Sequence, residues 1–439
     1  MEEKILIINA GSSSLKFSLC NMPSATEIVN GLVEKIGEGD SFYSLKFNGQ
    51  KIEKQKNIKN HSEAVQVMLK ELLENKFIET VEEIKAVGHR VLHGGEIYSE
   101  SVVIDENVLD NIKSLTKLGP LHLPGEIDGI ESMKENMPEA IQVAVFDTAF
   151  HQTIPEENYM YAVPYSWYEE NGVRKYGFHG TSHKYITEVV QKELNKENVN
   201  LIICHIGSGA SMACIKNGKC CDTTMGLTPL DGLMMGTRSG DIDPSIIEYI
   251  CKEKNLNVSE VTTILNKESG LKGICGKNDF RDVTALAQNG DRKAKLAITL
   301  FEKSIVKYIA QYYFELEGKV DAIIFTAGVG ENMSYVREDI INYISNPMGI
   351  KVNKAANDNI AKFKQYQSGV ITTEDSKIEV MVIPTNEEYM ILKDTYELSK
   401  SRNQNYQLIK EIKNYWQNTF FVIYFKGRFA KNLKFIKNN

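Results

Sequence analysis

The sequence contains no apolar run approaching the ~20 residues that a transmembrane helix needs, so we expect no membrane-spanning segment. The N-terminal stretch MEEKILIINAGS is acidic before its apolar run and lacks the basic region of a signal peptide. The chain also lacks CxxC pairs and the Cys/His spacings of zinc sites, and its seven cysteines are scattered. We therefore expect free thiols in a reducing compartment, which predicts a cytoplasmic protein.

A basic body is absent as well. The 439 residues carry a net charge of −7, but residues 401–439 hold eight of the 51 basic side chains and one of the 58 acidic ones. The first 400 residues therefore carry −14, which argues against a nucleic-acid-binding core. Residues 401–439 are basic and aromatic and contain no pattern that indicates chemistry.

Short β-branched runs alternate with amphipathic helices, which predicts an α/β architecture. Strands are expected at 4–8, 84–88, 142–146, 201–205, 321–327 and 378–384. Apolar residues at helical spacing predict helices over 62–76 and 292–316. The second helix is expected to bury Leu296, Leu300, Ile305, Ile309 and Tyr312 along one face.

Two segments share one plan: KILIINAGSSSLKFSLC at 4–20 and NLIICHIGSGASMACI at 200–215. Each is a β-rich run, a polar residue, a Gly/Ser turn and a second strand-like run. The repeat recurs once after nearly 200 residues, which indicates a duplicated fold rather than a solenoid. We predict an N-terminal lobe over 1–150, onto which 385–400 packs back, a C-terminal lobe over 151–384, and a tail over 401–439.

Three glycine-bearing loops follow predicted strands, at 9–14, 205–211 and 326–332. Glycine lets backbone N–H groups approach an anion closely. One such loop is usually only a tight hairpin, but three in one chain favour phosphate binding. None matches GxxxxGK[ST] or GxGxxG, so the expected site is formed by hairpins of two lobes facing across a cleft. Lys16 follows the first loop closely enough to reach a phosphate, or else is a solvated strand residue.

Seven of the eight histidines lie in Gly-, Pro- or Asp-marked junctions, which predicts a polar cleft near Arg90 and Asp147. They are His89, His93, His122, His151, His179, His183 and His205. A metal site made by these histidines is weakly indicated, since no pair has HxxxH spacing beside an acid. Arg238 and Arg281 lie in polar turns, where each either clamps an anion or pairs with a neighbouring acid.

Eight motifs together resemble the acetate kinase family over residues 4–398: NAGSSSLKF, GHRVLHGGE, VFDTAFHQT, KYGFHGTSHKY, MGLTPLDGLMMGTRSGDIDP, NDFRD, FTAGVGEN and IPTNEE. The resemblance implies duplicated ribonuclease-H-like lobes of the actin-like ATPase type around a nucleotide cleft. It also implies a homodimer and reversible, Mg²⁺-dependent phosphoryl transfer from ATP to acetate, with Mn²⁺ as an alternative metal. The intact TAGVGEN motif favours ATP over pyrophosphate as donor.

By motif position, the resemblance implies a role for each site residue. Asp147, His179 and Arg238 are the implied catalytic residues, with Arg90 on the acetate carboxylate. The methyl pocket is walled by Leu92, Leu121, Phe178 and Pro229. Asn9 and Glu387 position the metal. The nucleotide contacts are Lys16, His205, Ile206, Gly207, Ser208, Gly209, Asp279, Phe280, Arg281, Gly328, Val329, Gly330, Glu331 and Asn332.

The chain departs from the family pattern at a few positions. Leu123 replaces an asparagine and so removes an amide from a loop that we expect beside the cleft, and Ser208 also replaces an asparagine. Residues 273–280 form a stretch one residue shorter than is common, and 401–439 has no counterpart; a read-through or frameshifted extension would explain it. Two other functions stay open: a propionate-preferring kinase of the same fold, and a non-kinase actin-like ATPase.

Overall fold

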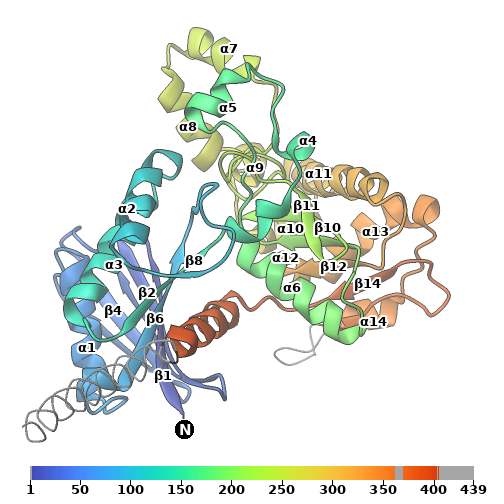
Figure 1. The fold of residues 1–439 in the computed structure, drawn as a ribbon. Helices are drawn as coiled ribbons and strands as arrows, with labels where there is room; N and C mark the ends of the chain where they lie inside the picture. The colour runs from blue at the N-terminus through green and yellow to red at the C-terminus, as the bar shows by residue number, and fades with distance from the viewer. Residues whose placement is uncertain (1, 361–368, 403, 405–439) are drawn as a thin grey trace, which may run out of the picture.

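The computed structural model describes residues 2–360, 369–402 and 404 of the chain. Most of the predicted tail at 401–439 therefore lies outside the described residues. Two separate sheets dominate the fold, as Figure 1 shows. No helix in the described part of the chain is long and apolar enough to cross a bilayer.

The first sheet has eight strands in the order β5-β4-β3-β2-β1-β6-β8-β7. Its central strand carries ILII at 5–8, and these four side chains are buried, which suits a strand covered on both faces. The strands are β1 (Glu3–Ala10), β2 (Ser14–Met22), β3 (Thr26–Glu34), β4 (Phe42–Phe47), β5 (Gln50–Gln55), β6 (Ile84–Val91), β7 (Val102–Val103) and β8 (Ile141–Phe146).

The second sheet has six strands in the order β11-β10-β9-β12-β14-β13. Its first five, β11-β10-β9-β12-β14, repeat the pattern of β3-β2-β1-β6-β8: two antiparallel hairpin strands on one side of the lobe's first core strand (β1 or β9) and two parallel strands on the other. The predicted duplication of the fold is confirmed. The strands are β9 (Leu201–Ile206), β10 (Ala210–Lys216), β11 (Lys219–Thr223), β12 (Ala322–Thr326), β13 (Gly369–Val370) and β14 (Glu379–Val382).

Helices cover both faces of each sheet. In the first lobe they are α1 (His61–Glu74), α2 (Glu106–Ser114) and α3 (Leu123–Asn136). The connection to the second sheet carries α4 (Glu156–Tyr159), α5 (Ser166–Asn171) and α6 (Gly180–Glu193). The rest are α7 (Ser245–Lys254), α8 (Val258–Lys267), α9 (Gly270–Cys275), α10 (Phe280–Gln288), α11 (Arg292–Glu315), α12 (Ala327–Asn332), α13 (Ser334–Met348) and α14 (Lys354–Asn359). Short 3-10 turns lie at Val81–Glu83, Leu115–Leu118 and Ala149–Thr153.

The two helices predicted from periodicity exist, but the buried face of α11 differs from the prediction. Its helix starts at the cap Asp291, whose side chain accepts the N–H of Ala294. Ile305, Ile309 and Tyr312 are buried as expected, whereas Leu296 and Leu300 are exposed. The buried stripe runs instead through Ala297 and Phe301, one position on and about 100° further round the helix.

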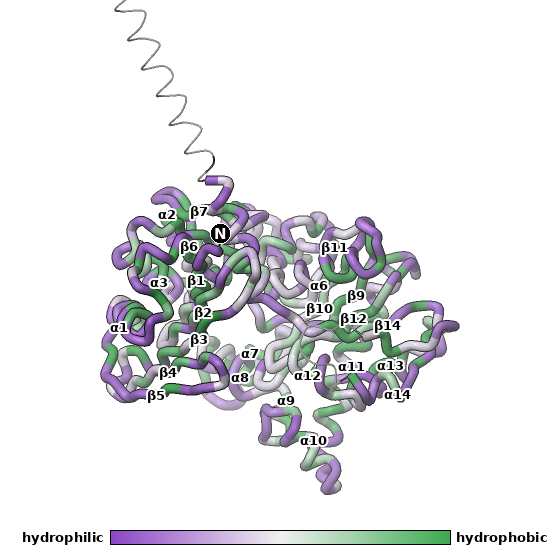
Figure 2. The backbone as a smooth tube through the Cα atoms, turned by 90° about the horizontal axis from the view of Figure 1, so that it is seen from below, coloured by the Kyte–Doolittle hydropathy of each residue, from purple (hydrophilic) through white to green (hydrophobic). Residues whose placement is uncertain are grey.

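A helix over residues 387–402 returns to the first sheet, and in Figure 1 it lies in red beside the blue lobe. Ile391 and Leu392 join the apolar cluster that includes Ile5 and Ile7. The helix packs so closely on β6 that a Cβ at Gly88 would lie 2.2 Å from Thr395 Oγ1. Figure 2 shows the central strands of both lobes as largely hydrophobic tube, with hydrophilic residues concentrated on the outside.

Candidate active site

An ion pair between a buried carboxylate and a half-buried guanidinium lies where two strands of the first sheet end. Arg90 leaves β6 and Asp147 directly follows β8, and these neighbouring parallel strands end side by side. Arg90 Nη2 donates to Asp147 Oδ2 at 2.6 Å and Nε donates to Oδ1 at 3.1 Å. Asp147 raises the pKa of Arg90, which therefore stays charged. Burial raises the pKa of Asp147, and Arg90 opposes that rise.

Histidines of the second lobe pack against one another beside this pair. His179 caps α6 in the left-handed region, with φ of 57°, and stacks on His205 at 4.3 Å between ring centroids. His179 Nδ1 and His183 Nε2 both hydrogen-bond Ser211 Oγ, each at 2.9 Å. Burial, then the neighbouring histidines and arginines, lowers the pKa of His179 well below its usual value. The ring is therefore neutral at physiological pH.

The two predicted cationic turns have different outcomes. Arg281 lies 78% exposed and pairs bidentately with Asp279, which is also the cap of α10. Arg281 therefore forms the ion pair with a neighbouring acid that was the alternative to anion binding. Arg238 instead donates to the carbonyl oxygen of Pro229 at 3.3 Å, and burial lowers its pKa; no carboxylate in the described part of the chain opposes this shift. Its guanidinium also lies near Gly209, so it is placed to meet an anion.

A cavity of about 480 Å³ adjoins this cluster in the second lobe. It brings together all three nucleotide segments named from the sequence. From these segments Gly207, Ser208, Asp279, Phe280, Arg281, Gly328, Val329 and Asn332 line it. Gly236, Leu271, Asn278 and Met333 complete the lining and were not predicted from the sequence. Gly236 and Asn278 belong to the quoted motifs MGLTPLDGLMMGTRSGDIDP and NDFRD, which could have indicated them, whereas Leu271 and Met333 belong to no quoted motif. Ile206 is buried in the core instead of facing the cavity.

The third glycine segment is not the loop that we expected. Residues 327–332 form the short helix α12 directly after β12. Glu331 Oε1 accepts the N–H groups of Ala327 and Thr385, so its carboxylate holds the backbone in place. The buried Arg337 donates to the carbonyl oxygens of Gly330 and Glu331.

The first hairpin lies next to the strand that carries Arg90, because β1 pairs with β6 through Ile8 and His89. Asn9 and Lys16 are paired across β1 and β2, at the turn that begins with Gly11. The charge of Glu387, at the start of the returning helix, acts on both Arg90 and Asp147. Among the described residues, no group of three or more His, Cys, Asp or Glu side chains is arranged to hold a metal ion.

The four residues predicted to wall the methyl pocket differ in their surroundings. Leu92 and Phe178 are buried in one apolar cluster, and Pro229 contacts Arg238. Leu121 is 71% exposed. Leu123 is not on a cleft-side loop as expected: it starts α3 and is fully buried among Val91 and Phe146, because its apolar side chain joins the first-lobe core.

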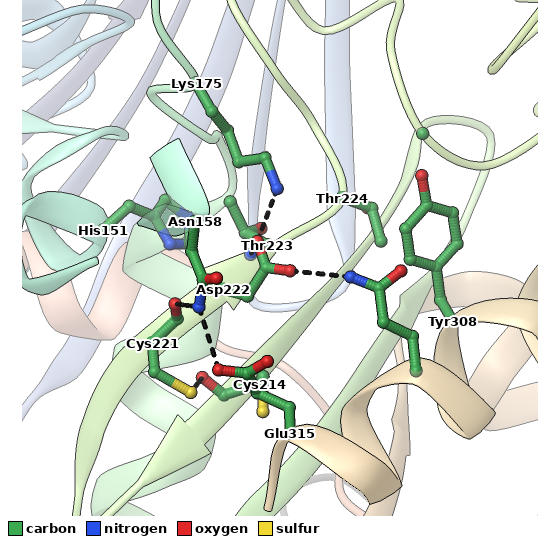
Figure 3. Close-up of polar contacts among 12 residues, drawn as sticks. His151, Asn158, Lys175, Cys214, Cys221, Asp222, Thr223, Thr224, Tyr308 and Glu315 are labelled. Atoms are coloured by element: carbon green, nitrogen blue, oxygen red, sulfur yellow. Dashed lines mark hydrogen bonds and ion pairs between the residues drawn. The ribbon is translucent and has the colours of Figure 1, made fainter. Parts of the chain in front are cut away.

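A polar network that was not predicted from the sequence links the segment before His179 to β11 and α11 (Figure 3). Lys175 Nζ donates to Asp222 Oδ1 at 2.5 Å, and Gln311 donates to Oδ2 at 3.0 Å. Asn158 donates to the carbonyl oxygen of Cys221 and to Glu315. The network ties the chain just before Phe178 and His179 to β11 and α11.

Two lobes built on one strand order, a glycine turn in each, and the Arg238 guanidinium near the Arg90–Asp147 pair define a two-lobed phosphotransferase of the actin-like ATPase type. Comparison with known proteins specifies the family. A sequence model of the Acetokinase family matches residues 4–393. The acetate kinase of Clostridium novyi (strain NT) is 49% identical over 405 residues, covering 91% of this chain and 99% of that protein.

Solved structures agree. The crystal structure of Porphyromonas gingivalis acetate kinase matches with a TM-score of 0.86 at 40% identity, over 90% of this chain and 99% of that one. A propionate kinase from Francisella tularensis subsp. tularensis SCHU S4 matches with a TM-score of 0.84 at 44% identity, over 90% and 100%. The chain belongs to the acetokinase family and is a phosphotransferase whose acceptor is a carboxyl group.

Proposed function

We propose that this chain transfers the γ-phosphoryl group of ATP reversibly to acetate, giving acetyl phosphate and ADP. The observation that carries the proposal is the Arg90–Asp147 pair, in which a buried carboxylate binds a half-buried guanidinium bidentately beside His179. A guanidinium matches a carboxylate in shape and charge, and Leu92 and Phe178 offer apolar surface to a short alkyl group.

The acceptor needs no general base. Acetate has a pKa of about 4–5, like Asp or Glu, so it is ionised at neutral pH and has no proton to lose. Asp147 already binds Arg90 through both oxygens, and we assign it to orienting that guanidinium. The attacking carboxylate oxygen then forms the new bond to phosphorus as the bond to the ADP oxygen breaks.

His179 and Arg238 stabilise the transferring phosphoryl group in the transition state, in which charge is spread over its equatorial oxygens. Since His179 is neutral, we infer that Ser211 donates to Nδ1 and leaves Nε2–H free as a donor. Arg238 contributes the positive charge. ATP is held by Lys16, the turn His205–Gly209, Asp279–Arg281 and Gly328–Asn332. Within these segments, Ile206 and Glu331 support the backbone and do not contact the nucleotide.

Mg²⁺ fits the residues on the acceptor side. It prefers oxygen ligands, takes one or two from protein and fills the rest with water and phosphate. Asn9 and Glu387 would supply an amide oxygen and a carboxylate oxygen, and the charge of Glu387 acts on both Arg90 and Asp147. When bound, the metal would neutralise charge on the β- and γ-phosphates.

The wider organisation follows from the same proposal. We divide the chain into lobes 1–150 and 151–384, with 385–400 returning to the first lobe. We place the protein in the cytoplasm, since all seven cysteines are free.

We propose a homodimer through α5, α7 and α8, which lie together in Figure 1 and expose Trp167, Ile246, Tyr249 and Val258. Sedimentation of Tyr249→Glu, expected to shift toward monomer, tests this contact.

The activity is tested by acyl phosphate formation from ATP and Mg²⁺ with acetate, propionate and butyrate compared by kcat/KM. Acetate is expected to be preferred. Propionate is the second candidate, since a propionate kinase is among the close structural matches and Leu121 leaves that wall open. ATP hydrolysis without acyl phosphate from any acid would refute the kinase proposal.

A further inference from the structure

One buried carboxylate beside the acceptor site has no place in the mechanism above. Glu126 lies in the first turn of α3 and is only 4% exposed. Its Oε2 accepts the backbone N–H of Leu92 at 2.9 Å. The carbonyl oxygen of Val91 accepts the N–H of Asp147 at 2.9 Å. The strand end that carries Arg90 is therefore held from one side by Asp147 and from the other by Glu126.

Charges on the neighbouring elements act on Glu126. Arg90 on β6 favours its ionised form, and Asp147 after β8 disfavours it. From α1, His61 hydrogen-bonds the carbonyl oxygen of Gly11. Two ion pairs, Lys113–Glu131 and Lys134–Glu106, join α2 to α3, and Asp128 on α3 is exposed. Burial is the largest effect and raises the pKa of Glu126 to about 7, although the hydrogen bond from the N–H of Leu92 and the charge of Arg90 both act to lower it.

We propose that Glu126 is a positioning residue whose carboxyl group takes up a proton when acetate binds at Arg90, so that acetate affinity falls as pH rises through neutrality. This inference rests on the proposed function, because it places acetate on Arg90. An incoming acetate adds a second negative charge beside the strand end that Glu126 holds. Like charge disfavours the ionised form of a neighbouring carboxyl, so the bound complex favours neutral Glu126.

The sign of the effect follows from linkage. A group that binds a proton more tightly in the complex makes ligand binding consume protons, so affinity falls with rising pH between its free and bound pKa values. If acetate raises the pKa of Glu126 by about one unit, the KM for acetate rises up to about tenfold above neutrality. Acetate itself stays ionised throughout this range, so it contributes no dependence of its own.

The experiment measures the KM for acetate from about pH 6 to about pH 8.5, where a single shifted carboxyl predicts a rise of about three- to tenfold. In Glu126→Gln the amide oxygen still accepts from Leu92, and the KM for acetate is expected to be flat with pH. The KM for ATP is expected to have the same pH dependence in both proteins. Glu302→Gln is the matched control, because Glu302 is also 4% exposed with its pKa raised to about 7, but lies on α11.

Calorimetry of the unmodified protein gives an independent measurement if Glu126→Gln fails to fold. Acetate binding in buffers of different ionisation enthalpy, at about pH 7.5, is expected to take up about half a proton. No proton uptake, or a pH-dependent KM that persists in Glu126→Gln, overturns the proposal and assigns any titration to another group. Acetyl phosphate formation at about pH 6.5 tests the proposed function separately; an active enzyme with a flat KM refutes only the role of Glu126.

Discussion

Replacing Asp147 by asparagine tests whether this carboxylate orients Arg90 or moves a proton. Asparagine has the same shape, so one of the two hydrogen bonds to the guanidinium survives while the other is replaced by an N–H facing N–H groups. A hydrogen bond to a charged group contributes about 1.5–3 kcal/mol. Losing about 2–3 kcal/mol of acceptor positioning lowers kcat/KM for acetate by about 30- to 150-fold.

Steady-state kinetics with acetate and ATP varied separately show where the loss falls. We expect most of it in the KM for acetate, because a misoriented Arg90 binds the carboxylate poorly, and little in the KM for ATP. Glu71→Gln is the control: it also neutralises a buried, hydrogen-bonded carboxylate in the first lobe, but its partners Tyr43 and Lys54 lie away from the acceptor site.

A general base would leave a different signature. Removing one lowers the chemical step by about 10²- to 10⁴-fold and leaves ground-state binding largely intact. A collapse of kcat with an unchanged KM for acetate would therefore contradict the orienting role. So would a solvent deuterium isotope effect on kcat that disappears in Asp147→Asn.

Three further predictions concern groups outside the acceptor pocket. Lys175→Met leaves the buried Asp222 unpaired and is expected to lower the free energy of unfolding by about 3–5 kcal/mol, measured by urea denaturation; full stability in this variant would show that the pair is dispensable. Arg337→Lys loses part of the fork that holds the end of α12 and should raise the KM for ATP about three- to tenfold with the KM for acetate unchanged. Glu302 has a folded pKa of about 7, above its ordinary 4.5, so it destabilises the fold as pH rises between these values. Glu302→Gln should raise the free energy of unfolding by about 1–3 kcal/mol at about pH 8 and have little effect at about pH 4; an equal effect at both pH values would contradict the shift.

The central strands were predictable because β-branched runs such as ILII at 5–8 have few alternatives to a buried strand. The same reasoning misplaced the stripe of α11. Leu296 and Leu300 fit a helical face as well as Ala297 and Phe301 do, and only the neighbouring core selects between the two faces. The segment 326–332 was misread for a related reason, since its two glycines suggested a loop where the backbone begins a short helix.

The sequence by itself determined the repeated strand–turn–strand unit and the motifs that assign the family, and it predicted Arg90, Asp147 and His179 as residues of the site. Those are local patterns, and each is contained within a few neighbouring residues. Only the tertiary structure decided which charges are paired: Arg281 forms an ion pair with Asp279, whereas Arg238 donates to the carbonyl oxygen of Pro229 and burial lowers its pKa. Only the tertiary structure shows that the buried carboxylate of Glu126 accepts the N–H of Leu92. The reason is physical, because desolvation and charge pairing depend on what surrounds a side chain in space and not on what precedes it in the chain.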